Sequence, residues 1–286
     1  MGYLLLALSA VSYAVGIVAQ TVAARRAEVR DRIDPGLLAR LATDPVYVIG
    51  FSAQVVGFLL AFLARATLPL YLVQASAMSA VGIAAVIGGV LLKWRIRSVE
   101  IGSLGITAVG LLLLVGAAEP SAATQLPAAV GFGMIGVLVA VAAAAVPAAK
   151  VPGPRGAVVM GALAGVAFAI LAIASRPLAG GPLAELPLRP LFWLMVVAAL
   201  IGQALLAAAL QRGSSTATMA SMDSVSVLLA SVAGLAVLGD RIVAGREAWV
   251  AGGLALVVCG VFVMAAVQAR GPAATTHEVP KEAARG

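Results

Sequence analysis

The chain has 286 residues, of which 62% are hydrophobic and 11% charged, and its mean hydropathy is +1.09. A soluble protein of this length has about a quarter charged residues, because polar side chains must cover its core. The composition therefore excludes a soluble enzyme, a disordered chain and a nucleic-acid-binding domain. The net charge of +7 does not change this, since the basic residues stand in short gaps between long apolar runs.

Nine apolar runs are long enough to cross a bilayer as helices, which takes about 20 residues each. Open strands cannot satisfy their backbone groups in lipid, so all nine are predicted as helices. In chain order they cover residues 2–23, 46–64, 69–92, 100–118, 128–148, 156–174, 191–210, 215–238 and 248–269. We therefore expect an all-α integral membrane protein with one membrane domain, residues 1–269. Its halves are about 1–120 and 121–269, followed by a disordered cytoplasmic tail, 270–286.

The first run has its positive charges after it, at Arg25 and Arg26, and none before it. We therefore expect a retained membrane helix and not a cleaved signal peptide. In the gap that follows, Asp34 and Pro35 have the pattern of a helix N-terminus. This gap is either a short helix that lies in the membrane interface or an ordinary tether between two spans.

The distribution of Lys and Arg predicts the orientation of the chain. With nine alternating spans, fourteen of the 19 basic residues fall on one side of the membrane and five on the other. Basic loops stay in the cytoplasm. We therefore predict a multi-pass protein of the cell membrane, with its N-terminus outside and its C-terminus in the cytoplasm.

The two halves of the chain show a weak internal repeat. An offset of 147 residues lays the second and third spans over the seventh and eighth. It superposes Leu59, Ala61, Leu63 and Arg65 on Leu206, Ala208, Leu210 and Arg212. An offset of 150 lays the fourth span over the ninth, and places Gly102 and Gly110 on Gly252 and Gly260. The matched halves enter the membrane in opposite directions, which is typical of secondary transporters with a substrate site at the midplane.

The segments 59–79 and 205–224, with the glycine pairs that follow them, resemble the EamA-type repeat of the drug/metabolite transporter superfamily. The resemblance covers nearly the whole chain. Nine helices and the segment Pro69, Leu72 and Val73 are similar to the NIPA-type branch of magnesium transporters. The resemblance implies transport by alternating access, and efflux more often than uptake.

Asp223 is the strongest candidate for a substrate or coupling-ion site, because ionisable residues inside a span are costly and mark functional sites by default. It is predicted to face a cavity between the third and eighth spans and to couple transport to protons or another cation. The alternative is a structural carboxylate that pairs with an arginine or accepts backbone bonds. At the repeat offset Asp223 matches Ser76, and Ser221 matches Gln74. We expect Gln74 and Ser76 to share the face that lines this cavity.

Other polar residues in the apolar runs have two interpretations each. The amides of Gln20, Gln54 and Gln203 either bind substrate or bond across helices, and Tyr13 either lines the cavity or packs. Arg65 and Arg212, at span ends, either extend to the membrane interface or act as gates, and the first role is expected. Glycines within the spans are expected to allow close helix approach. These are Gly82, Gly88, Gly89, Gly102, Gly161, Gly165, Gly252 and Gly260.

The function predicted from these residues is a secondary transporter of a small molecule, with proton-coupled efflux as one form. The alternatives are a NIPA-like divalent cation transporter and a membrane scaffold without transport. The protein is not expected to be an enzyme: His277, the single histidine, is in the tail, and Cys259 is the single cysteine. No cofactor, metal site or nucleic-acid partner is predicted. The predicted partners are the substrate, protons and the lipid bilayer, for a monomer or homodimer.

Overall fold

The computed structural model describes residues 1–26, 43–91, 98–122, 125–210 and 215–269. Within these residues the chain forms nine α-helices, one 3-10 helix and two short strands. In chain order they are α1 Gly2–Arg26, α3 Pro45–Ala64, α4 Leu70–Leu91, α5 Ser98–Ala117, β1 Ala118–Glu119, α6 Ala128–Ala148, α7 Gly153–Leu178, η1 Leu183–Leu188, α8 Pro190–Leu210, α9 Ser215–Ala236, β2 Arg241–Ile242 and α10 Glu247–Ala269. The expected helix or tether at Asp34 and the expected disordered tail both lie outside the described residues.

The helices begin and end close to the predicted spans. Seven are long and apolar enough to cross a membrane, and α5 and α10 hold shorter apolar segments among the described residues, Ile101–Ala117 and Glu247–Gly260. Large apolar side chains cover the outside of the bundle; Leu112, Phe132 and Leu200 are exposed by 70%, 73% and 66%. A surface of this kind is stable in lipid and not in water. The chain is thus a helical membrane protein, and nine crossings remain a prediction.

The largest difference from the predicted spans is at the end of α7. The prediction ended at residue 174, but the helix continues to Leu178 and carries Ser175 and Arg176 in its last turn. Both side chains are completely buried. The predicted span ended before Arg176 because a charged residue lowers the hydropathy of the run. In the structure Arg176 stays in the helix because Asp240 pairs with it.

A local signal sets the start of α3. The Asp44 carboxylate accepts hydrogen bonds from the backbone N–H groups of Val46, at 2.7 Å, and Tyr47, at 3.3 Å. Pro45 occupies the first helical position, where its missing N–H costs nothing. This end of α3 is therefore specified by two consecutive residues, Asp44 and Pro45.

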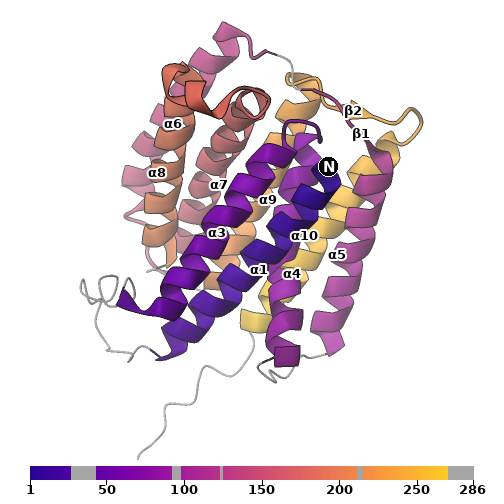
Figure 1. The fold of residues 1–286 in the computed structure, drawn as a ribbon. Helices are drawn as coiled ribbons and strands as arrows, with labels where there is room; N and C mark the ends of the chain where they lie inside the picture. Colours follow the sequence, from indigo (N-terminus) through magenta and orange to yellow (C-terminus); the bar gives the residue numbers. More distant parts are fainter. Residues whose placement is uncertain (27–42, 92–97, 123–124, 211–214, 270–286) are drawn as a thin grey trace, which may run out of the picture.

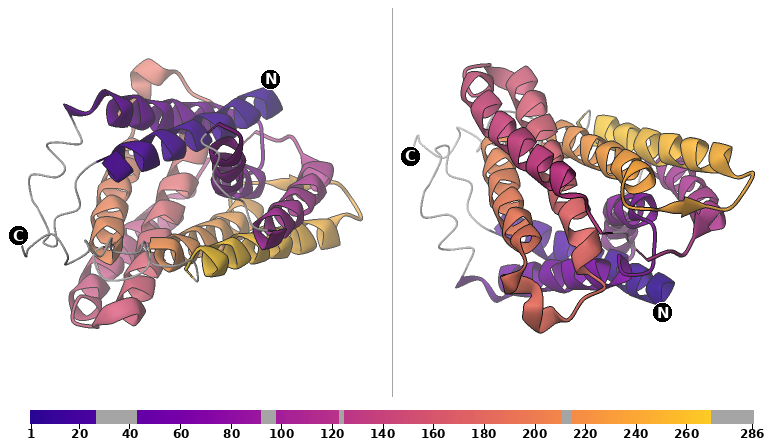
Figure 2. Two further views of the ribbon diagram at one scale, coloured as in Figure 1. Left: turned by 90° about the horizontal axis from the view of Figure 1, so that it is seen from below. Right: turned by 90° about the horizontal axis from the view of Figure 1, so that it is seen from above.

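The helices form three groups that surround α4 and α9 (Figures 1 and 2). In the first group α1 packs along α3, and α1 also packs on α4. In the second, α7 packs along α8 and on α9, with α6 against α7 and α8. The third is the pair α5 and α10. Because α4 and α9 contact each other as well as these groups, they join the two halves at the centre of the bundle.

Two short strands close one end of the bundle, which we call the β end. β1 and β2 are antiparallel, with Ala118 opposite Ile242 and Glu119 opposite Arg241. The Tyr71 hydroxyl, from the first turn of α4, lies 3.4 Å from the Ala117 carbonyl and 3.3 Å from that of Arg241. The N-terminus lies at the same end (Figure 1). The β end therefore ties α4, α5 and α10 together.

Some of the predicted glycine contacts are confirmed and others are wrong. A Cβ on Gly161 would lie 2.7 Å from the Thr218 carbonyl oxygen, and one on Gly260 would lie 2.9 Å from that of Ser103. These glycines let α7 approach α9 and α10 approach α5. In contrast, a Cβ on Gly102 or Gly252 would meet no atom within 4 Å, because both face away from the neighbouring helices.

Candidate functional site

A completely buried ion pair lies at the β end. The Arg176 guanidinium, at the end of α7, donates to Asp240 Oδ1 at 2.7 Å, and both side chains are 0% exposed. Asp240 follows α9, and its Oδ2 accepts from the Leu70 backbone N–H, at the start of α4, at 2.5 Å. Burial raises the pKa of Asp240, while the Arg176 charge and the Leu70 N–H oppose that rise. This pair bonds α7 to the loop after α9 and to the start of α4.

Arg176 also binds the first half of the chain through two carbonyl groups. It donates to the carbonyl of Arg65, where α3 ends, and to that of Ser121 at 3.0 Å. Charge-assisted bonds of this kind are stronger than neutral ones. The buried pair therefore holds residues of both halves together at the β end.

Arg65 is a second buried cation at the same end. The expectation that it extends to the membrane interface is wrong, because its side chain is 3% exposed and points into the bundle. Its guanidinium donates to Ser175 Oγ at 3.0 Å and to Gln74 Oε1 at 3.2 Å. It lies 5.8 Å from the centre of the Phe58 ring. Burial, partly offset by Tyr13, lowers the pKa of Arg65 to about 10, so that it stays protonated at neutral pH.

The polar contacts continue from Arg65 toward the middle of the bundle. Gln74, on α4, accepts from Arg65 and donates through Nε2 to Ser226 Oγ, on α9, at 3.1 Å. Asp223 lies one turn before Ser226 on α9, and residues three apart share a helix face. Three residues rise about 4.5 Å along the axis. A row of polar groups thus runs from Arg65 through Gln74 and Ser226 to the face of α9 that carries Asp223.

Asp223 is partly buried, and we find no hydrogen bond or ion pair for its carboxylate within the described parts of the chain. Ser221, two residues earlier, donates to the Val158 carbonyl of α7 at 3.1 Å. Ser221 therefore ties α9 to α7, whereas Asp223 faces the same side as Ser226.

The sequence predicted that Ser76 and Gln74 share a helix face, and this prediction is wrong. Residues two apart on a helix point in nearly opposite directions. Ser76 is buried at 9% exposure, and its carbonyl accepts from the Ser79 hydroxyl at 2.6 Å. The structure therefore brings Gln74, and not Ser76, to the row that leads to Asp223.

The remaining predicted site residues lie elsewhere. Gln20 and Gln54 bond to each other across α1 and α3 at 3.3 Å, on the seam between these helices. Gln203 is exposed on the outside of α8. Tyr13 is partly buried on α1, where its ring lies against Gly57 of α3, and it interacts electrostatically with Arg65. Tyr13 is thus the one of these four that adjoins the polar row.

Arg176 and Asp240 were missed as site residues. Both lie two residues beyond the end of a predicted span, and 64 positions separate them in the chain. The one available signal was an arginine two residues beyond an apolar run. That signal does not say which acid, if any, will meet it.

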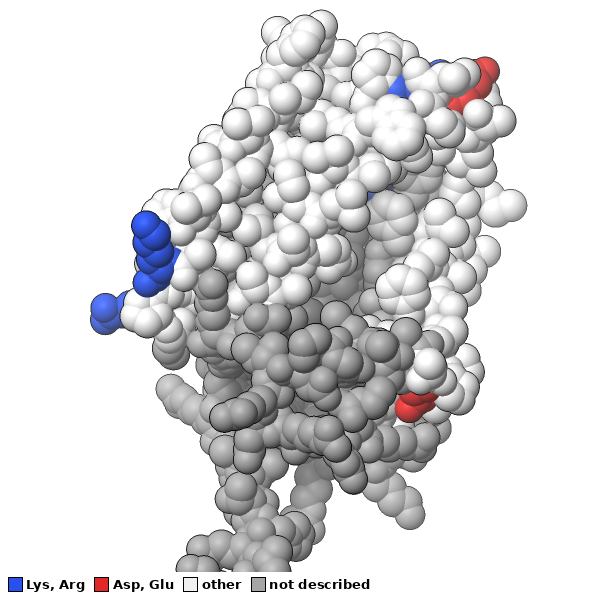
Figure 3. Space-filling model, turned by 90° about the vertical axis from the view of Figure 1, so that its left-hand side faces the viewer, with Lys and Arg blue, Asp and Glu red and all other residues white. Residues whose placement is uncertain are grey.

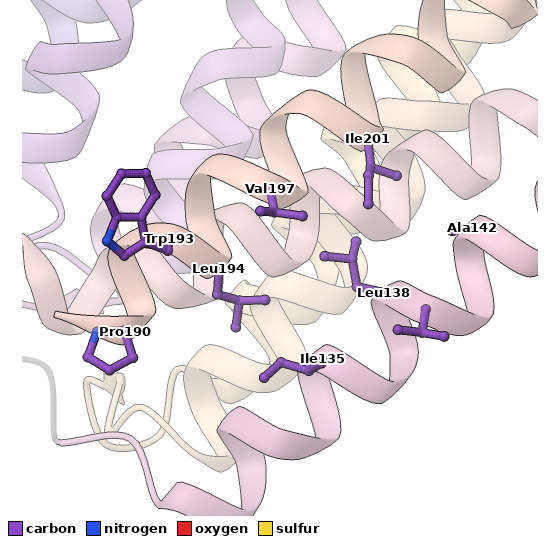
Figure 4. A pocket seen from close by; sticks show the side chains of 9 residues that line it. Ile135, Leu138, Ala142, Pro190, Trp193, Leu194, Val197 and Ile201 are labelled. Carbon is purple, nitrogen blue, oxygen red and sulfur yellow. The ribbon is translucent and has the colours of Figure 1, made fainter. Parts of the chain in front are cut away.

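An apolar groove of about 430 Å³ lies between α6 and α8 (Figure 4). Its lining includes Ile135, Leu138, Trp193 and Val197. The polar atom of Trp193, Nε1, already donates to the Pro187 carbonyl at 2.9 Å. Since no convergent polar groups line this groove, it offers nothing to select a polar ligand, and it is separate from the polar row.

Comparison of the chain with protein-family models, with curated proteins and with solved structures finds no match. The function must therefore be inferred from the chain's own residues, those of the polar row and of the buried cluster at the β end. The part of the chain that the structure describes contains no group of three or more His, Cys, Asp and Glu side chains placed to hold a metal ion.

Proposed function

We propose that this protein is a secondary transporter of a small molecule that works by alternating access, of the drug/metabolite transporter type. The observation that carries the proposal is the polar row from Arg65 through Gln74 and Ser226 toward Asp223, inside an otherwise apolar bundle. Buried polar groups cost free energy, and in membrane helices they mark substrate or ion pathways. A membrane scaffold has no need of such a row.

The packing of the helices supports two similar halves. In the first half α1 packs on α3 and α4, and in the second α7 packs on α8 and α9. This pairing extends the sequence repeat, in which α3, α4 and α5 match α8, α9 and α10. By this matching α1 corresponds to α7, and α6 has no counterpart in the first half. Two halves that can move as units are the parts that alternating access requires.

The seam between α5 and α10 supports a twofold relation between these halves. The offset of 150 maps Ser103 to Gly253 and Gly110 to Gly260. A Cβ on Gly110 would lie 2.8 Å from the Gly253 carbonyl oxygen, and one on Gly260 would lie 2.9 Å from that of Ser103. Exchanging α5 and α10 by this offset converts the first contact into the second. A twofold axis through the seam requires this relation.

The bonds at the β end suggest which end is closed in this conformation. Asp240 and Arg176 belong to the second half, and they bond Leu70 and Arg65 of the first. Seen from the left of Figure 1, the surface is hollowed along its middle (Figure 3). We propose that the β end is the outer side, closed by these bonds, and that a substrate exchanges with the interior from elsewhere.

A NIPA-like magnesium pathway is less favoured by the same residues. Divalent cations take six or more oxygen ligands, most of them carboxylates or carbonyls. Asp223 is the acid that the polar row supplies, and Arg65 places a positive charge at its other end. A cation with two charges would meet repulsion there and would find few ligands.

Water access to the interior tests the proposal. Ser226→Cys, in a Cys259→Ser background, places a single thiol in the polar row. We expect a membrane-impermeant maleimide to label it in vesicles from the side away from the β end. Leu228→Cys is the matched control, since it lies on the same helix but 48% exposed to lipid, and it should stay unlabelled. An Ser226→Cys thiol that no reagent reaches from either side would indicate a dry scaffold.

The coupling role of Asp223 has its own test. Asp223→Asn keeps the shape of the side chain and removes its charge. In reconstituted vesicles we expect this change to abolish accumulation driven by a proton gradient, while exchange of substrate across the membrane continues. Unchanged proton-driven accumulation would assign Asp223 a structural role.

A further inference from the structure

The charges at the β end do not balance. Among the described residues, the buried cluster there contains two guanidinium groups, Arg65 and Arg176, and one carboxylate, Asp240. Both oxygens of Asp240 accept hydrogen bonds: Oδ1 accepts from Arg176 Nε and a terminal nitrogen, and Oδ2 accepts from Leu70. The charge of Asp240 therefore compensates Arg176, and one positive charge is left.

That charge is on Arg65, and its observed partners are neutral. Ser175 and Gln74 accept one bond each, and Nε has no partner although it is completely buried. The titratable groups that act on Arg65 are Arg176, whose positive charge repels it, and the Tyr13 phenol. Of the acids in the loops at this end, Glu185 is exposed and paired with Arg189, and Glu119 pairs with Arg241 across the strands. Neither of these acids compensates Arg65.

An unpaired buried cation is costly, since breaking a buried pair by removing one partner costs several kcal/mol. A neutral side chain could donate the same hydrogen bonds to Ser175 and Gln74 without burying an unpaired charge. A purely structural role therefore does not explain an arginine at position 65. The guanidinium presents five N–H donors in a plane, and adjacent donors match the two oxygens of a carboxylate. Nε and one terminal nitrogen form such an edge.

We propose that Arg65 binds the carboxylate of an organic anion, which is the substrate of this transporter. This inference rests on the proposed function and deepens it. The carboxylate accepts from Nε and a terminal nitrogen of Arg65 in a bidentate pair, and supplies the missing negative charge. Gln74 and Ser175 hold the guanidinium in place, and Phe58, 5.8 Å from the guanidinium carbon, provides an apolar wall beside the ligand.

Binding of benzoate to the purified protein in nanodiscs of neutral lipid tests the proposal directly. Benzoate carries a carboxylate and an aromatic ring, and benzamide has the same shape without the charge. We expect benzoate to raise the midpoint of thermal unfolding of the wild type, and benzamide to bind at least tenfold more weakly. Arg65→Gln should lose benzoate binding by tenfold or more. Arg189→Gln is the matched control, a partly exposed arginine at the same end, and it should bind as the wild type does.

Equal binding of benzoate by the wild type and Arg65→Gln would overturn the assignment, and so would equal binding of benzoate and benzamide by the wild type. Arg65→Lys keeps the positive charge but loses the planar pair of donors. If Arg65→Gln does not fold, weaker binding of benzoate by Arg65→Lys supports the assignment, and unchanged binding overturns it.

Flux of radiolabelled benzoate in vesicles separates this inference from the proposed function. If benzoate binds through Arg65 but is not carried across the membrane, the anion site is supported and the proposed transport function is contradicted. The opposite result is also informative. If the protein does not bind benzoate but carries neutral or cationic compounds, and Arg65→Gln leaves that flux unchanged, the proposed transport function stands and the anion site is wrong.

Discussion

Two of the regions in which the halves of the chain meet are built in different ways. At the β end, Arg176 and Asp240 bond to Arg65 and Leu70 through charged groups that are completely buried. Along the α5–α10 seam the contact is between backbones, because Gly110 and Gly253 would each place a Cβ 2.8 Å from the other's carbonyl oxygen. One contact depends on charge and the other on the absence of side chains.

This difference indicates different roles. Polar partners can be exchanged for water or for a ligand, so a bond such as that between Asp240 and Leu70 can open and close at modest net cost. A close contact between backbones has no substitute partner and is lost when the helices separate. The seam is therefore suited to remain closed as a pivot, and the β end is suited to open.

Asp240→Ala should have the largest effect, because it leaves Arg176 buried without a counter-charge. We expect the free energy of unfolding to fall by about 3–5 kcal/mol, measured by thermal or denaturant unfolding in detergent. Glu119→Ala is the control, since Glu119 lies 3.9 Å from Arg241 in an exposed pair. Such a pair contributes about 0–1 kcal/mol. Similar losses in both variants would show that the buried pair does not hold the β end.

Gly253→Ala should have the next largest effect. Its Cβ would collide with the Gly110 carbonyl and with Leu114, so the two helices must move apart. Overpacking of this kind costs about 1–3 kcal/mol. The neighbouring Gly252→Ala is a matched control, because a Cβ there meets no atom within 4 Å. Alanine favours a helix over glycine by up to about 1 kcal/mol, so this control should be neutral or stabilising in the same unfolding assay.

Ser226→Ala should have a smaller effect on stability than on transport. It leaves the Gln74 amide without its acceptor, which costs about 1–3 kcal/mol for a buried group and less if water enters. If the row carries substrate, flux into vesicles should fall more than the stability loss explains. Ser231→Ala is the comparison on the same helix, since that hydroxyl bonds the Val227 carbonyl within α9. Equal flux in both variants would place Ser226 outside the transport path.

Gln20→Leu together with Gln54→Leu should have the smallest effect. Their bond across α1 and α3 is 3.3 Å long, and amide bonds between membrane helices contribute about 0.6 kcal/mol on average. A double-mutant cycle in detergent should give a coupling energy of this order and leave flux unchanged. A large loss of flux would instead place this pair in the substrate path.

Much of the fold could be predicted from sequence because the signals are local. The apolar run of α6 was predicted with the bounds observed, Ala128–Ala148, and Asp44 with Pro45 specifies the start of α3. The site was predicted only in part. Gln74 was expected to act with Ser76, but its partners are Arg65 and Ser226.

The sequence by itself determined that the chain is helical, that it lies in a membrane, and where its apolar helices begin and end to within four residues. These properties follow from the free energy of transferring each apolar run into lipid, which is a sum over residues that are neighbours in the chain. The tertiary structure alone decided that Arg65 and Arg176 turn inward. Whether a charge at a helix end reaches water or stays buried depends on the partner that packing brings to it. That partner, Asp240 for Arg176, is remote in sequence and is selected by how the helices rotate and pack.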